Sequence, residues 1–192
     1  MLNAGTSLRV IEAGRAYDAR VPRIVLTVIG DDRAGLVAAL SEVVSTHDGN
    51  WERSQLAELA GKFAGIVVVS VPDERVEALT AAVRALDGLL DVSAYPASGR
   101  ADNRPEQLLT IDLLGNDRPG IVHEVSSVLH RHELSIEMME THTREAPMAG
   151  GQLFEAHIVV KVPASAEPEA LRADLERLAT ELLVDIALSP VE

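Results

Sequence analysis

A glycine that precedes an expected helix, with an aspartate three residues before it, occurs twice in this chain and is its clearest candidate for chemistry. Residues 30–37 read Gly-Asp-Asp-Arg-Ala-Gly-Leu-Val, and residues 115–122 read Gly-Asn-Asp-Arg-Pro-Gly-Ile-Val. Gly35 and Gly120 stand where a helix is expected to begin, so the N–H groups of its first turn and the positive end of its dipole are unobstructed. Such a helix terminus binds a carboxylate or a phosphate with little help from side chains.

Asp32 and Asp117 lie just upstream of these helices. A short acidic side chain in that position is expected to cap the helix, and it could also hold an ammonium group. Together, the helix terminus and the aspartate predict one pocket that grips both charged ends of an amino acid. The spacing also fits a plainer role, in which the aspartate only caps the helix, the glycine only forms the turn, and nothing binds.

The hydrophobic pattern around both loops predicts the order strand, helix, strand, strand, helix, strand. In the first copy, strands are expected at residues 23–29, 50–58, 63–71 and 89–95, and helices begin near residues 36 and 72. In the second copy, strands are expected at residues 108–114, 134–144, 152–162 and 184–188, and helices begin near residues 121 and 168. The helical spacing predicts that Val37 and Val122 face inward.

A unit that is used twice predicts two domains. Each is expected to be an α+β, ferredoxin-like βαββαβ domain, in which a four-stranded antiparallel sheet carries two helices on one face. We expect an N-terminal extension over residues 1–21, domains over residues 22–96 and 106–192, and a linker rich in Pro, Gly and Arg over residues 97–105.

The composition excludes several classes of function. The 192-residue chain has no cysteine, which removes disulfides, thiolate catalysis and cysteine-based metal sites. A formal net charge of −13 disfavours nucleic acid, and aromatic residues at 3% are too few for an RNA-stacking surface. No apolar run approaches the roughly 20 residues that span a bilayer. The first residues also lack the apolar middle of a secretory signal, so we expect a cytoplasmic protein.

The histidines are expected to have structural roles. The three histidines of residues 123–132 match no strong ligand spacing, so no metal and no other cofactor are expected. His47 and His132 match between the copies near helix C-termini, where the dipole stabilises a protonated ring. His142 and His157 are expected to lie near each other across the second hairpin, where solvent exposure explains them.

The repeated loop carries a resemblance to a known family. The strand followed by Asp-Arg-Pro-Gly-Ile-Val at residues 117–122 resembles the first strand, loop and helix of ACT domains, the small-ligand regulatory modules found beside enzymes of amino-acid metabolism. The first copy is similar, with Ala34 in place of proline. Two such domains and nothing else resemble the glycine cleavage system repressor family, whose members act without a DNA-binding domain by modulating a partner regulator.

In ACT domains the effector commonly sits between paired domains and touches the first loop, the start of the first helix and the start of the second strand. Carried over to this sequence, the resemblance implies as ligand-binding residues Asp32, Ala34, Gly35 and Asn50 in the first copy and Asp117, Pro119, Gly120 and Ser135 in the second. Asn50 and Ser135 can both hydrogen-bond a ligand, but they differ. The two copies therefore need not bind the same molecule.

The resemblance implies a non-enzymatic regulator that binds a small amino acid, with glycine as the first expectation, and modulates a transcription regulator or a metabolic partner by protein–protein contact. A homodimer is expected, because the edge strands of such sheets often pair. Two alternatives stay open: a regulatory ACT pair that joins an amino-acid or folate enzyme, and an interaction scaffold without a ligand. No catalytic residues are expected, because no nucleophile, base or water-positioning set accompanies the loops.

Overall fold

The structure is a computed structural model and describes residues 21–86, 88–97, 107–146, 150–163 and 166–190. The chain divides into two compact units, Met1–Ala101 and Asp102–Glu192, and each unit has its own hydrophobic core. Almost all of the expected N-terminal extension (residues 1–21) and of the expected linker (residues 97–105) lies outside the described residues. None of the described helices is long and apolar enough to cross a membrane.

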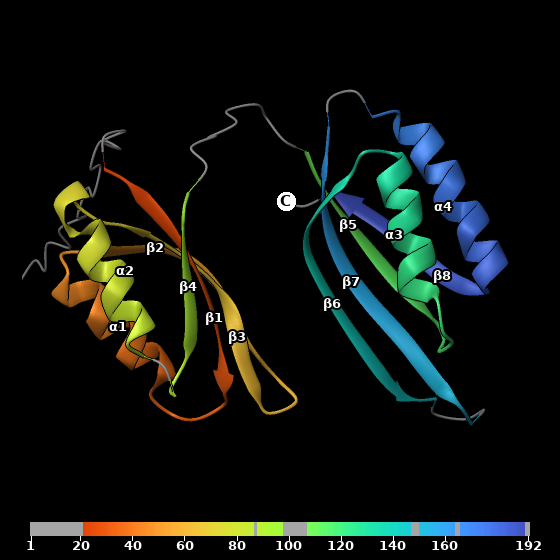
Figure 1. Cartoon of the computed structure of the whole chain (residues 1–192). Helices are drawn as coiled ribbons and strands as arrows, with labels where there is room; N and C mark the ends of the chain where they lie inside the picture. Colours follow the sequence, from red (N-terminus) through yellow and green to blue (C-terminus); the bar gives the residue numbers. More distant parts are fainter. Residues whose placement is uncertain (1–20, 87, 98–106, 147–149, 164–165, 191–192) are drawn as a thin grey trace, which may run out of the picture. The chain divides into compact units, whose positions relative to one another are not determined.

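The first unit has the predicted order of elements. Its strands pair in the order β2-β3-β1-β4, all antiparallel, and its two helices cover one face of the sheet (Figure 1). A short 3₁₀ turn at Asp73–Arg75 leads into the second helix. The elements are β1 (Arg23–Asp31), α1 (Leu36–Thr46), β2 (Asn50–Leu59), β3 (Lys62–Ser70), α2 (Val76–Arg84) and β4 (Asp91–Pro96).

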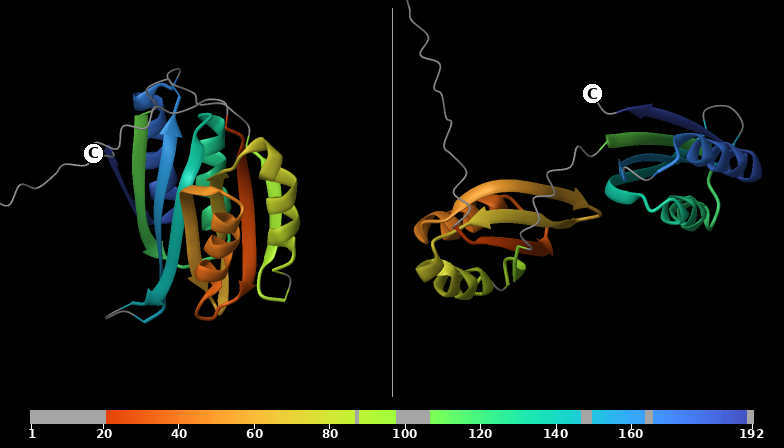
Figure 2. Two further views of the ribbon diagram at one scale, coloured as in Figure 1. Left: turned by 90° about the vertical axis from the view of Figure 1, so that its left-hand side faces the viewer. Right: turned by 90° about the horizontal axis from the view of Figure 1, so that it is seen from above.

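The second unit repeats this topology with the strand order β6-β7-β5-β8. Figure 2 shows the same two layers, helices on one side and sheet on the other, in each unit. The ferredoxin-like prediction is therefore confirmed for both copies. The elements are β5 (Gln107–Asn116), α3 (Ile121–Arg131), β6 (Ser135–Glu145), β7 (Gln152–Val162), α4 (Pro168–Leu182) and β8 (Val184–Pro190).

Each core fills the space between the sheet and its helices. Along β1, Ile24, Leu26 and Val28 are buried, and the residues between them point to the other face, as the period of two in a strand requires. The helices supply apolar stripes at helical spacing. In α1 the stripe is Leu36, Leu40 and Val44, and in α3 it is Ile121, Val125, Val128 and Leu129.

Both units have a β-bulge at the start of an edge strand, which the alternating sequence pattern did not predict. The register of β2 against β3 shifts between Trp51 and Arg53, and that of β6 against β7 shifts between Ile136 and Met138. The extra residue is a glutamate in each case. Glu52 lies 3.4 Å from Nε of Arg23, and Glu137 lies 3.1 Å from Nζ of Lys161. The bulge twists the strand locally and disrupts its pairing edge.

Candidate functional site

The repeated loop has the same backbone conformation in both units. Gly35 precedes α1 with φ 98°, and Gly120 precedes α3 with φ 99°, which is the left-handed region that favours glycine. The carbonyl of Gly35 accepts the N–H of Ala39 at 2.9 Å, and that of Gly120 accepts the N–H of Glu124 at 3.0 Å. The first N–H groups of each helix have no acceptor within the helix.

The prediction that Asp32 and Asp117 cap these helices is wrong. The residue at the N-cap position is the glycine, and no side chain makes a capping hydrogen bond at either helix. The aspartates lie three residues earlier, where their own N–H groups tie the loop to the neighbouring hairpin. Asp32 donates to the carbonyl of Gly61 at 2.9 Å, and Asp117 donates to that of Gln152 at 2.8 Å. Both carboxylates belong to exposed residues.

The arginine that both loops share makes different contacts in the two units. Arg33 donates from Nη2 to the carbonyl of Gly88 at 2.8 Å, across the turn between α2 and β4. Arg118 instead forms a two-pronged ion pair with Glu124, at 3.0 Å and 2.9 Å. The hydrogen bonds from Arg118 hold the pKa of the Glu124 carboxyl below its usual range, so Glu124 stays ionised. Ala39 stands at the matching position of the first unit.

This difference changes what each helix terminus offers to a ligand. A Cβ atom added to Gly120 would lie 3.3 Å from Oε1 of Glu124, whereas nothing lies within 4 Å of a Cβ atom added to Gly35. The terminus of α3 therefore carries a carboxylate of its own beside the glycine. That of α1 is open, and the dipole at a helix N-terminus favours an anion there.

The predicted site residues are only partly brought together. Asp32, Ala34 and Gly35 share one loop that follows the last residue of β1. Asn50 pairs with Ser70, which pairs with Arg23 at the first residue of β1. These positions therefore stand at opposite ends of the sheet, about 25 Å apart along a nine-residue strand.

The second unit has the same separation. Asp117, Pro119 and Gly120 follow the end of β5, whereas Ser135 pairs with Lys161, beside Leu108 at the start of β5. Neither Asn50 nor Ser135 can share a small ligand with the loop of its own unit.

Comparisons with known proteins identify the units. Family models described as the ACT domain match residues 22–94 and residues 109–180. The chain consists of two tandem ACT domains. The first match lies within the first unit, and the second match lies within the second unit.

The chain is similar over most of its length to a curated relative and to two solved structures. The chain is 24% identical over 161 residues to the glycine cleavage system transcriptional repressor of Escherichia coli K12, covering 83% of this chain and 85% of the relative. A solved structure of an unknown protein from Galdieria sulphuraria has 31% identity and a TM-score of 0.81, with 90% of this chain and 99% of that chain covered. A candidate glycine cleavage system transcriptional repressor has 15% identity and a TM-score of 0.67, with 91% and 99% covered, and shows the shared fold.

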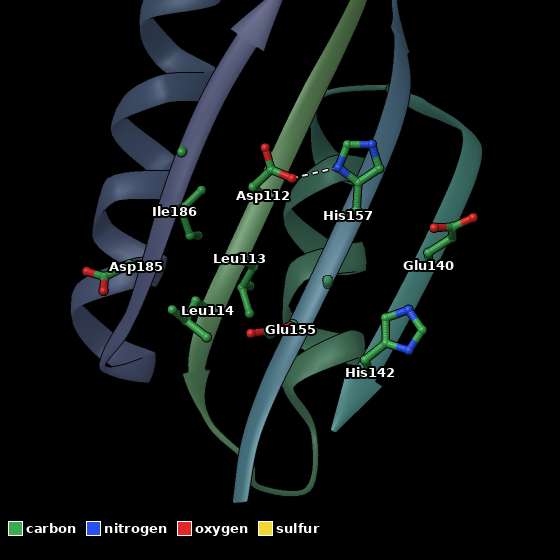
Figure 3. A pocket seen from close by; sticks show the side chains of 11 residues that line it. Asp112, Leu113, Leu114, Glu140, His142, Glu155, His157, Asp185 and Ile186 are labelled. Atoms are coloured by element: carbon green, nitrogen blue, oxygen red, sulfur yellow. Dashed lines mark hydrogen bonds and ion pairs between the residues drawn. The ribbon is translucent and has the colours of Figure 1, made fainter. Parts of the chain in front are cut away.

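A shallow concavity of about 410 Å³ on the helix-free face of the second ACT domain is lined by six ionisable side chains, those of Asp112, Glu140, His142, Glu155, His157 and Asp185 (Figure 3). There, Nδ1 of His157 lies 2.6 Å from Oδ1 of Asp112. His142 pairs with Glu155 and His157 with Glu140 on neighbouring strands, so the two histidines are diagonal neighbours, as predicted. The described residues contain no group of three or more His, Cys, Asp or Glu side chains arranged to hold a metal ion.

His47 and His132, which match between the two copies, make contacts at the ends of α1 and α3. Nδ1 of His47 lies 2.8 Å from the carbonyl oxygen of Val43, in the last turn of α1. Nε2 of His132 lies 2.9 Å from Oδ2 of Asp174 and so links the end of α3 to α4. Both roles are structural, as the sequence predicted, although the partner on α4 was not foreseen.

Sequence reasoning misplaced one pair of residues at the loop. Val37 and Val122, each the second residue of its helix, were expected to face the core, but they are 45% and 43% exposed. An apolar side chain therefore stands beside the loop in both ACT domains. The signal was present in the repeat itself, because both copies keep a valine at this position.

Proposed function

We propose that this protein is a cytoplasmic, non-enzymatic regulator that binds a small amino acid, glycine in the first instance, and modulates a transcription regulator or a metabolic partner by protein–protein contact. The observation that carries the proposal is the open N-terminus of α1 at Gly35. ACT domains and a relative named as a transcriptional repressor support a regulatory role. The net charge of −13 supports contact with a protein and not with DNA.

The effector is proposed to bind the first ACT domain more tightly than the second. Its carboxylate would accept hydrogen bonds from the first N–H groups of α1, and the exposed carboxylate of Asp32 would face its ammonium group. At the second loop, the carboxylate of Glu124 already stands beside Gly120. A second negative charge there is disfavoured, because it would lie beside this carboxylate and compete with it for Arg118.

The remaining predicted residues, Asn50 and Ser135, would have to reach the effector from another ACT domain, because each lies at the far end of its own sheet. The protein is therefore proposed to act as a homodimer of tandem ACT domains over residues 22–96 and 106–192. An effector that binds one arrangement of the domains better than another shifts their populations, and a partner protein reads that shift.

Calorimetric titration with glycine and the other small amino acids tests this proposal. The wild-type protein is expected to bind at least one of them. Ala39→Glu places in the first ACT domain the acidic side chain that the second already has, and it is expected to weaken binding about tenfold or more, because like charges would meet at the helix terminus. Glu124→Ala is the matched control in the second ACT domain and is expected to leave the tighter binding event unchanged.

Two results would contradict the proposal. Binding of no amino acid would favour a scaffold without a ligand. Ala39→Glu binding as well as wild type would remove the α1 terminus as the site. Circular dichroism of each variant separates loss of binding from loss of fold.

A further inference from the structure

The helix-free face of the sheet in the first ACT domain is uncharged over its centre. Towards the middle of the two central strands, β1 and β3, the outward-facing residues are Val25, Thr27, Ile29, Ala64, Ile66 and Val68. Large apolar side chains on this face are unusually open: Ile29 is 51% exposed, Ile66 48%, and Tyr95 on the neighbouring β4 54%. We call this surface the open face of the first ACT domain.

The second ACT domain provides an internal comparison, because strand pairing matches its positions to those of the first one by one. Charged or ionisable side chains occupy five central positions of its helix-free face. At each of these positions the first ACT domain has an uncharged residue. Asp112, Glu140, His142, Glu155 and His157 correspond to Thr27, Gln55, Ala57, Ala64 and Ile66.

The charges that the open face does carry lie at its margin. Arg53 is on the edge strand β2, and Asp91 is on the edge strand β4. The ion pair of Asp31 with Lys62 is at one end of the sheet, and that of Arg23 with Glu52 is at the other. An uncharged centre within a polar rim is the anatomy of a protein–protein interface. A charged centre, as in the second ACT domain, is instead typical of a surface that stays exposed to water.

The size of the open face fits a dimer. A sheet of four strands, nine residues long in β1 and β3, measures about 30 Å by about 19 Å. Two such faces together would bury about 1,100 Å², against the roughly 1,000 Å² that a specific interface requires. Twisted sheets pack face to face in this way, about 10 Å apart.

A second copy of this face is the occupant that its chemistry fits best. An uncharged surface with a polar rim is complementary to itself, as a two-fold interface requires. A face with carboxylates such as Asp112 and Glu140 is a poor occupant, because their water would be lost without an opposing charge. The edge strand β2 is also poorly suited to pairing, because its bulge and the charged side chains of Glu52 and Arg53 interrupt it.

We propose that the open face of the first ACT domain, centred on Ile66, is the homodimer interface of this protein and packs against the same face of a second copy. This inference rests on the proposed homodimer, and its test does not require the effector. It replaces the edge-strand pairing that the sequence led us to expect with packing of sheet on sheet.

Sedimentation velocity over a concentration series tests the interface. The wild-type chain is expected to be a dimer at micromolar concentration. Ile66→Glu is expected to weaken the dimer about 100-fold or more, because two unpaired carboxylates would be buried in each interface. The matched control is His157→Glu, at the corresponding position of the second ACT domain, which is expected to remain a dimer.

Each alternative outcome overturns the inference and identifies what fails. A monomeric wild-type chain removes both the interface and the proposed homodimer. A dimer that survives both Ile66→Glu and Tyr95→Glu keeps the homodimer but assigns it to another surface, such as the edge strands. Dissociation of His157→Glu would assign it to the second ACT domain. Because Ile66 and Tyr95 are about half exposed, these variants are expected to fold, and circular dichroism checks that they do.

Discussion

Glycine is required in the repeated loop for two different physical reasons. Gly35 and Gly120 have left-handed backbones, and a Cβ atom on Gly35 would meet nothing within 4 Å. Gly30 and Gly115 lie in strands, where neighbouring atoms leave no room for a side chain. A Cβ atom would lie 2.7 Å from the carbonyl oxygen of Leu89 at Gly30 and 2.2 Å from Cγ1 of Val184 at Gly115. The first pair permits a turn, and the second permits close packing.

Gly115→Ala is expected to destabilise the second ACT domain by about 2 kcal/mol, because the added methyl group overlaps a buried valine. Val184→Ala removes Cγ1 but is itself destabilising, so in the double variant the two losses are expected to be less than additive, which is the recovery to be measured. Gly35→Ala is the comparison: its cost of about 1 kcal/mol comes from backbone strain alone. Urea unfolding followed by circular dichroism measures all three. Equal losses without any recovery from Val184→Ala would contradict the close-approach explanation.

At this scale the sequence predicted positions better than contacts. The turn at Gly35 and Gly120 followed from the repeat and from their place before a helix. The ion pair of Arg118 with Glu124 could not be predicted from the repeat, because both loops contain the arginine. Its contacts depend on whether the helix offers a glutamate, as at Glu124, or an alanine, as at Ala39. The predicted helix caps were wrong because three residues separate Asp32 from the helix. In the folded loop, the N–H of Asp32 instead bonds to the hairpin at Gly61.

Among the elements, α3 and α4 are joined by a polar contact that depends on pH. The hydrogen bond from His132, with a further contribution from Arg177, holds the pKa of Asp174 below its usual range. A carboxyl whose pKa is lower in the folded state stabilises the fold when it is ionised. That contribution is complete above the pKa of the unfolded chain, near 4, and is lost as the pH falls through the lower folded value.

Asp174→Asn is therefore expected to lower the free energy of unfolding of the second ACT domain at pH 6. The difference from wild type should shrink as the pH falls from about 5 towards 3. A double-mutant cycle with His132→Ala checks the partner, since the coupling between the two positions should disappear at the acid end. A difference that does not change with pH would show that Asp174 contributes by packing and not by charge.

The order and type of the elements could be read from the sequence, but their irregularities could not. Runs such as residues 66–69 and the leucine spacing of residues 171–178 predicted a strand and a helix that the structure contains. The bulges at Glu52 and Glu137 could not be predicted, because one extra residue changes which side chains face inward without changing the composition of the strand. The separation of Asn50 from the first loop follows from topology, since β2 and β1 start at the same end of the sheet, with β3 between them, and the loop follows the other end of β1.

The two ACT domains of the molecule share one fold but differ in their surfaces. The first ACT domain has an open helix terminus and a sheet face that is uncharged at its centre, whereas the second has the carboxylate of Glu124 beside its helix terminus and a charged sheet face. We therefore propose that effector binding and self-association both belong to the first ACT domain. A protein partner with complementary basic groups would then bind the charged surfaces of the second.

Binding of a small amino acid at the first loop can be observed through the amide resonances of its glycine. Selective ¹⁵N labelling of glycine makes Gly35 and Gly120 visible in one spectrum of the intact chain, during titration with unlabelled glycine and then with the other small amino acids. We expect that one of these amino acids shifts the Gly35 resonance to saturation, while the Gly120 resonance moves little. A Gly35 resonance that none of these amino acids moves would contradict it.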